Sequence, residues 1–95
     1  MASGGTSRQQ AIFSRTEWAA LAPSLGLTRC QMQVVQLVFA GLHDKAIAVH
    51  LGRSRATIRT HLRRAAVRLG ADDMVGMVLE VFRRFRASCA GRRSR

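Results

Sequence analysis

Apolar residues recur along this chain at intervals of three and four, the spacing that places them on one face of an α-helix. Between these stretches stand the small polar residues and glycines that are typical of helix ends. The pattern predicts helices over residues 15–21, 29–40, 45–51, 55–69 and 74–86. Since no stretch alternates apolar and polar residues as a strand does, we expect an all-α protein.

Each predicted helix begins after a side chain that can bond the first free backbone N–H groups. These capping residues are Ser14, Thr28, Asp44, Ser54 and either Asp72 or Asp73. A glutamate or glutamine follows the first two at the three-residue spacing of a capping box. The expected helix stops are Pro23 with Gly26, then Gly41, Gly52 and Gly70.

The predicted helices divide the chain into one domain between two tails. Residues 1–12 are rich in Ser, Gly and Gln, and residues 87–95 are basic and contain Gly91, so we expect both segments to be flexible. Residues 13–86 would form a single small helical bundle, in which a short helix precedes the others.

The charge balance adds a candidate partner to this bundle. Lys and Arg number 16 against 5 Asp and Glu, which gives a formal net charge of +11, and Lys45 is the only lysine. Arginine presents a planar fork of donors that suits phosphates and guanine edges. The excess therefore favours a nucleic acid, with an anionic membrane surface as the weaker alternative.

Two consecutive helices, 45–51 and 55–69, are joined by Gly52-Arg53-Ser54 and have the length and turn of a helix-turn-helix. Each residue of a helix turns by 100°, so positions three and four apart on the second helix form two opposed stripes. The stripe expected to face the core is Ile58, Leu62, Ala65 and Leu69. The stripe expected to face outward is Ala56, Thr60, Arg63 and Val67.

The second of these helices carries arginines and no acid. Like charges four residues apart repel, so an exposed helix selected for stability alone would usually mix signs. A polyanion would turn this repulsion into attraction, and a helix fits the major groove, where arginine binds guanine and Thr60 could touch a thymine methyl group. The alternative is a basic face that is merely solvated.

From Leu27 to Val78 the chain resembles the LuxR/GerE-type helix-turn-helix domain of bacterial transcription regulators. The matching residues are Leu27-Thr28, Gly41-Leu42, Asp44-Lys45, Ile47-Ala48, Leu51, Thr57-Ile58-Arg59, His61 and Leu69-Gly70. The resemblance implies a four-helix core that reads double-stranded DNA. It implies base contacts from Arg59, Thr60 and Arg63, and phosphate contacts from Lys45, Thr57 and residues near the helix starts. The phosphate contacts that we expect are Lys45, Ser54, Arg55, Thr57 and Arg64.

The helix predicted over 74–86 has more apolar surface than one core needs. Its apolar residues span an arc of about 200°, whereas packing on one core takes about 100° or somewhat more. We interpret the surplus as a homodimer seam through Met74, Val78, Val81 and Phe85, and the family resemblance implies the same. The competing interpretation is that Phe13, Trp18 and Leu21 of the first helix cover this surface.

The sequence gives no indication of an enzyme, a metal or a cofactor. His43, His50 and His61 lack metal-ligand spacing, and no Gly-rich phosphate loop occurs. Cys30 and Cys89 are too few for a disulfide framework or a zinc site, and we expect both to be reduced. With no signal segment and no apolar run of about 20 residues, we expect a cytoplasmic protein that associates with the nucleoid and not with a membrane.

Our main hypothesis is a sequence-specific DNA-binding transcription regulator whose helix 55–69 enters the major groove. One alternative is a promoter-binding protein similar to the fourth region of a sigma factor, because residues 59–69 resemble that region; RNA polymerase would then be a partner. An alternative of another class is a protein-interaction module that reuses the helix-turn-helix without reading DNA.

Overall fold

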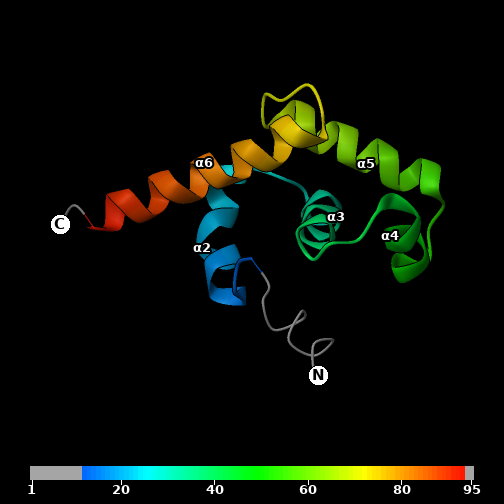
Figure 1. The fold of residues 1–95 in the computed structure, drawn as a ribbon, viewed down its shortest axis with the longest axis horizontal. Helices are drawn as coiled ribbons and strands as arrows, with labels where there is room; N and C mark the ends of the chain where they lie inside the picture. The colour runs from blue at the N-terminus through cyan, green and yellow to red at the C-terminus, as the bar shows by residue number, and fades with distance from the viewer. Residues whose placement is uncertain (1–11, 94–95) are drawn as a thin grey trace.

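In a computed structural model, residues 12–93 are described, with side chains placed for residues 12–89. These residues form helices and no strand, so the all-α prediction is confirmed (Figure 1). The helices are α2 (Arg15–Leu25), α3 (Arg29–Phe39), α4 (Asp44–Leu51), α5 (Arg55–Arg68) and α6 (Met74–Arg93). Helices α5 and α6 follow one another across the top of Figure 1, with α2 beneath α6 and α4 beneath the start of α5.

Local side-chain bonds start the helices largely as the sequence predicts. Both capping boxes form: the backbone N–H of Glu17 donates to Ser14 Oγ at 3.1 Å, and that of Gln31 donates to Thr28 Oγ1 at 3.1 Å. At the start of α6, Asp73 Oδ1 accepts the N–H of Gly76 at 2.8 Å. These bonds satisfy backbone donors that have no partner inside a helix.

The predicted end of the first helix near residue 21 is wrong, because α2 continues through Pro23 to Leu25. Proline removes one hydrogen bond, but its fixed φ is compatible with a helix. Burial of Leu25 in the core favours the extra turn. The helix ends at Gly26, which has a φ of 62° and donates its N–H to the carbonyl of Ala22.

The predicted end of the last helix near Arg86 is also wrong, because α6 continues to Arg93. Residues 87–90 are Ala-Ser-Cys-Ala and contain no proline, and a single glycine at 91 costs a helix only about 1 kcal/mol. The sequence therefore has no strong stop at this point. The other parts of the predicted tails, residues 1–11 and 94–95, lie outside the described residues.

The core lies where α5 crosses the other helices. Helix α5 packs against α3, α4 and α6, and α2 packs against α6. The predicted core stripe of α5 is confirmed, since Ile58, Leu62, Ala65 and Leu69 are all buried. Their buried neighbours include Val34, Val35, Ile47, Met77 and Val81. The core thus fixes which side of α5 remains exposed.

An aromatic cluster joins α2 to α6. Phe13, just before α2, is buried, and its ring centroid lies 5.1 Å from that of Trp18 and 5.5 Å from that of Phe39. On α6 its neighbours are Phe82 at 5.4 Å and Phe85 at 4.5 Å. The surplus apolar surface of α6 is therefore covered at least in part by α2 within the same chain, as the competing interpretation proposed.

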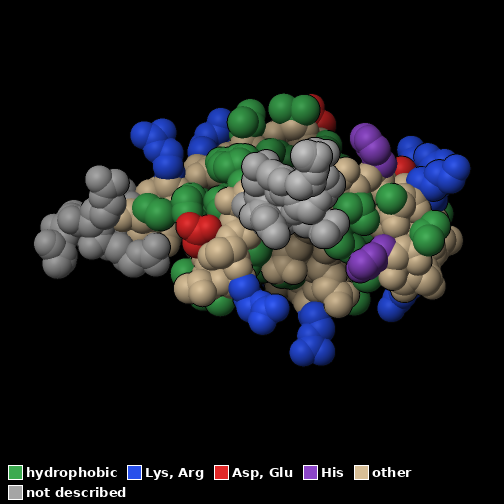
Figure 2. Space-filling view, turned by 60° about the horizontal axis from the view of Figure 1, so that its bottom comes forward, with side chains coloured by type: hydrophobic (Ala, Val, Ile, Leu, Met, Phe, Trp, Pro, Cys, Tyr) green, Lys and Arg blue, Asp and Glu red, His purple; other side chains and the backbone are tan. Residues whose placement is uncertain are grey.

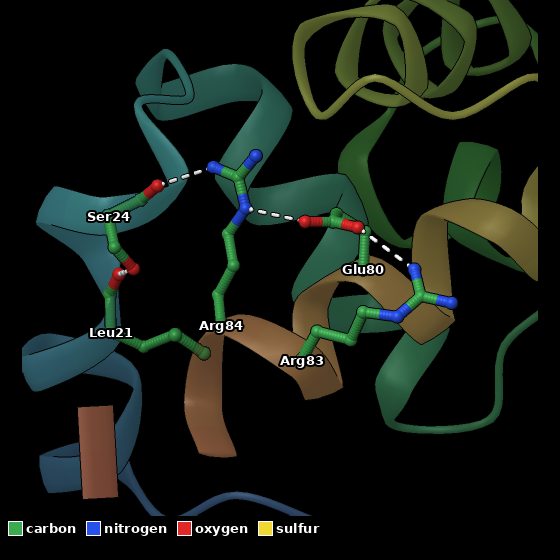
Figure 3. Close-up of polar contacts among 5 residues, drawn as sticks. All are labelled: Leu21, Ser24, Glu80, Arg83 and Arg84. Atoms are coloured by element: carbon green, nitrogen blue, oxygen red, sulfur yellow. Dashed lines mark hydrogen bonds and ion pairs between the residues drawn. The ribbon is translucent and has the colours of Figure 1, made fainter. Parts of the chain in front are cut away.

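Two arginines also bind the carboxyl end of α2. Arg84 Nη1 donates to the carbonyl of Ser24 at 2.6 Å, and Arg68 Nε donates to the carbonyl of Gly26 at 2.8 Å (Figure 3 shows the first contact). The end of a helix carries carbonyls without intrahelical partners and a partial negative charge, which cations stabilise. Because α2 has no basic residue in its own last turn, α5 and α6 supply the cations.

Glu80 holds Arg84 in this position, and the contact lowers the pKa of Glu80. Its two carboxylate oxygens accept hydrogen bonds from Arg84 Nε at 3.1 Å and Arg83 Nη1 at 3.0 Å, and these bonds hold the pKa of Glu80 below the usual 4.5 (Figure 3). The ion pairs thus stabilise the fold above pH 4.5 and lose that effect as the pH falls through the lowered pKa. An NMR titration of the Glu80 side-chain carboxyl should show a pKa below 4.5.

A pair of variants tests the cause of this shift. Arg84→Gln should raise the pKa of Glu80, because it removes the largest cause of the shift. Arg86→Gln removes an exposed arginine of the same helix that forms no ion pair with Glu80, and should leave the pKa unchanged. A wild-type Glu80 that titrates at or above 4.5 would contradict the assignment.

Candidate nucleic-acid interface

Helices α4 and α5 form the helix-turn-helix that the sequence predicts. Helix α4 ends at Gly52, whose φ of 65° is left-handed and favours glycine. The N–H of Arg53 then donates to the carbonyl of Ala48 at 2.9 Å, and Ser54 begins α5 by accepting the N–H of Thr57 at 3.1 Å. This turn sets α5 against α3 and α4 and leaves its far side open.

The exposed side of α5 is the stripe that the sequence places opposite the core. Arg63 is exposed, Val67 is 69% exposed, and Thr60 is half-buried. The 14 residues of α5 make a rod about 21 Å long. The face therefore has the size and shape of a helix that inserts into a groove, with a cation near its middle.

Asp44 organises the arginines at the start of α5. Its Oδ2 atom lies 3.5 Å from Arg55 Nη2 and 3.7 Å from Arg59 Nε. The prediction that Asp44 caps α4 is wrong, since Asp44 is the first residue of that helix and His43 stands at the cap without a side-chain bond. Partly exposed ion pairs contribute about 0–1 kcal/mol, so their main effect is to orient the two guanidinium groups.

The sequence reasoning missed this role of Asp44 because both ion pairs join different helices. One feature of the sequence pointed toward it: Asp44 is the only acid between residues 18 and 71, a stretch that is rich in arginine. A lone acid in such a stretch is surrounded by possible partners. Which arginines it meets depends on how α4 packs on α5.

The residues expected to contact phosphate lie on the surface of α4 and α5. Lys45, Arg55 and Arg64 are exposed, so their charges are accessible. The hydroxyls of Ser54 and Thr57 bond each other, with Ser54 Oγ donating to Thr57 Oγ1 at 2.9 Å. The Thr57 hydroxyl hydrogen is thus still available to an outside acceptor.

Basic side chains outnumber acidic ones on the face shown in Figure 2, where they stand at several places around its margin. Two other arginines have partners within the domain, because Arg68 and Arg84 bind the end of α2. The fold therefore separates arginines that stabilise the domain from arginines, such as Arg63, that face outward.

The residues expected at a dimer seam are only partly accessible. Val81 is 0% exposed, so its assignment to a seam is wrong: it belongs to the core of the single chain. Val78 and Phe85 are half-buried and pack against the same core, while Met74 is 41% exposed. The sequence pattern could not tell core positions from seam positions, because the apolar arc of α6 that packs on the core is continuous with the arc that packs on α2. The more exposed apolar residues of α6 are Val75 and Leu79, at 67% and 48%.

Among the described residues, no group of three or more His, Cys, Asp and Glu side chains is placed to hold a metal ion. None of the helices in residues 12–93 combines the length and apolarity needed to cross a membrane.

A family comparison agrees with this geometry. The family model described as "Bacterial regulatory proteins, luxR family" matches residues 25–81, which is more than half of the chain and spans α3, α4, α5 and the first part of α6. No curated protein and no solved structure matches the chain. The matched segment contains the whole helix-turn-helix and its exposed basic face, and we conclude that the chain belongs to the luxR family of bacterial regulatory proteins, a family that binds DNA and regulates transcription.

Proposed function

We propose that this protein binds double-stranded DNA with sequence preference and regulates transcription by inserting α5 into the major groove. The observation that carries the proposal is the division of α5 into two faces. One face is buried in the core, and the opposite face is exposed, basic and without any acid of its own. Affinity for phosphate and access to base edges both follow from such a face.

Base reading is assigned to Arg59, Thr60 and Arg63. The two arginines are one turn apart on α5, and either guanidinium could bind the O6 and N7 atoms of a guanine. Asp44 restrains Arg59, which lowers the entropy that this side chain would lose on binding. Thr60 lies between them in sequence and offers a methyl group and a hydroxyl.

Phosphate binding is assigned to Lys45, Ser54, Arg55, Thr57 and Arg64. The start of α4 supports this assignment, because its cap residue makes no side-chain bond to the first backbone N–H groups. Such N–H groups suit a phosphate oxygen, and the partial positive charge of the helix end adds to the attraction. Contacts of this kind position a protein on DNA without reading its sequence.

Selection of bound sites from a random duplex library tests the proposal most directly. Recovery of one recurrent sequence would support α5 as a reader of bases. Tight binding without any recurrent sequence among the bound duplexes would mean that the protein binds only the DNA backbone. Absence of binding at low salt would overturn the proposal and favour the protein-interaction module.

The affinity for the selected site should fall steeply as salt is raised. Each neutralised phosphate contributes about −0.9 to the slope of log K against log salt, so three cations at phosphates give about −3 per protomer. The three cations are those of Lys45, Arg55 and Arg64. Fluorescence anisotropy over a salt series measures the slope, and a slope near zero would contradict a phosphate-bound complex.

The protein is further proposed to act as a homodimer on paired half-sites, through Val75 and Leu79 on α6 together with Met74. These side chains are the apolar residues of α6 that the single chain leaves most exposed. Sedimentation with and without the selected DNA should show two protomers per site. Leu79→Glu should shift the protein toward monomer, whereas Val49→Glu, on the exposed side of α4, should not. A strict monomer on DNA would contradict the dimer.

A further inference from the structure

An open cavity of about 660 Å³ lies along one flank of α5, between the α3–α4 turn and the start of α6. Its size is within the range of small-molecule sites in proteins, about 300–1,000 Å³. Half of its lining residues have apolar side chains, and these are Val38, Leu42, Leu62, Ala66, Val67, Ala71 and Met74. It therefore offers an apolar body a place to be buried on an otherwise basic protein.

Only some of the charged groups on the rim of this cavity have a partner within the chain. Asp44 is already paired with Arg55 and Arg59, and Asp73 Oδ1 accepts the N–H of Gly76. Arg63, in contrast, forms no ion pair within the described part of the chain. Asp72, on the α6 side of the rim, likewise forms no ion pair with a described residue. The unmatched cation is thus on the α5 edge, and the unmatched acid is on the opposite, α6 edge.

We propose that this cavity binds an amphipathic organic anion: a small molecule with an apolar body and one carboxylate or sulfonate head. The body would lie on Leu62, Val67 and Met74, and the head would pair with Arg63. A guanidinium and a carboxylate or sulfonate form charge-assisted hydrogen bonds, which are about twice as strong as neutral ones. An acid on the opposite rim disfavours the reverse orientation of the ligand.

The site would connect a ligand to DNA reading. Arg59 and Arg63 line the cavity and are also the arginines assigned to base edges. A ligand that holds Arg63 and fills the flank of α5 would therefore compete with duplex DNA. This competition rests on the proposed function, whereas binding of the anion by the free protein does not.

A dye of the proposed class, anilinonaphthalene sulfonate, tests the cavity in the full chain without DNA. Val67→Glu places an acid in the cavity wall and should weaken dye binding about tenfold or more, because the new carboxylate lies one helical turn from Arg63, where it repels the sulfonate and competes for the guanidinium. Val49→Glu is the matched control: it makes the same change on an exposed helix position, 79% exposed, outside the cavity.

The matched pair separates the cavity from general attraction to a basic protein. Both variants lower the net charge equally, and circular dichroism should confirm that both are folded, since this dye also binds partly unfolded chains. Equal dye affinity in the two variants would overturn the cavity as the site. A loss confined to Val67→Glu would support it.

The anionic head is tested with phenylnaphthylamine, which has the same apolar body and no sulfonate. The wild-type protein should bind the sulfonate dye about tenfold more tightly than the neutral dye, and Arg63→Gln should abolish most of this preference. Equal affinity for the two dyes would overturn the anionic class of ligand.

Displacement of the dye by the selected duplex completes the test. Dye that leaves as DNA is added would support shared use of Arg59 and Arg63. Dye that stays on the DNA-bound protein would overturn the competition. Failure to bind DNA while the dye still binds would count against the proposed function alone, so the two failures are distinguishable.

Discussion

Replacing Phe13 by alanine is expected to lower the free energy of unfolding by about 3–5 kcal/mol, the usual cost of removing a buried phenylalanine. Phe13 is 4% exposed and contacts four aromatic rings from three helices. Natural domains have about 5–15 kcal/mol of stability in total, so this variant should lose much of what a chain of this size has.

Urea unfolding followed by the fluorescence of Trp18 measures this effect, because Trp18 is the only tryptophan and contacts Phe13 directly. Ile12→Ala is the control, since Ile12 precedes Phe13 but is exposed. It should change stability by less than about 0.5 kcal/mol. A small effect of Phe13→Ala would mean that α2 is not an integral part of the domain.

The aromatic cluster has a particular place relative to the family match. Phe13, Trp18, Phe82 and Phe85 all lie outside residues 25–81, and Phe39 alone lies inside them. The segments on either side of the matched region thus pack on each other. We therefore expect a fragment restricted to 25–81 to be less stable than the full chain by more than the Phe13→Ala variant is.

Replacing Arg63 by alanine is expected to cost about 1–3 kcal/mol of binding free energy on the preferred DNA site and to relax the preference at one base pair. The reason is that Arg63 is exposed on the middle of α5 and has no acid partner among the described residues, so its guanidinium is available to a base edge. Competition binding with single-base variants of the site measures both effects.

Arg64→Ala is the matched control for Arg63→Ala, because the two arginines are adjacent, exposed and equal in charge. Because Arg64 is assigned to a phosphate, Arg64→Ala should weaken binding to all sequences alike and reduce the salt slope by about 1. If Arg63→Ala instead gives the same loss on random DNA as on the selected site, Arg63 is a phosphate contact and not a reader.

The features that local sequence determines were predicted well. A capping box needs only residues three apart, so Ser14 with Glu17 and Thr28 with Gln31 could be identified without a structure. Helical periodicity likewise separated the buried Ile58 and Leu62 from the exposed Arg63 on α5. The ends of two helices were predicted less well. Burial of Leu25 extends α2 beyond residue 21, and the absence of proline after Arg86 lets α6 continue to Arg93.

Helical periodicity could show that α6 has apolar residues around much of its surface, but not what covers each of them. Val81 proved to be core, Phe85 meets Phe13, and Leu79 stays exposed. These three positions are on the same helix and differ only in which neighbour the fold places against them. The tertiary structure alone therefore decides which residues remain for a dimer.

The sequence by itself determined the all-α class, most helix starts, the helix-turn-helix and the basic face of α5, because each depends on contacts within about one turn or on composition. Only the tertiary structure decided how the charges are used. Asp44 orients Arg55 and Arg59 across a helix boundary, Arg68 and Arg84 bind the end of α2, and Arg63 is left facing outward. Partners 42 and 60 residues away along the chain, as for Arg68 and Arg84, are set by packing, which no local pattern encodes.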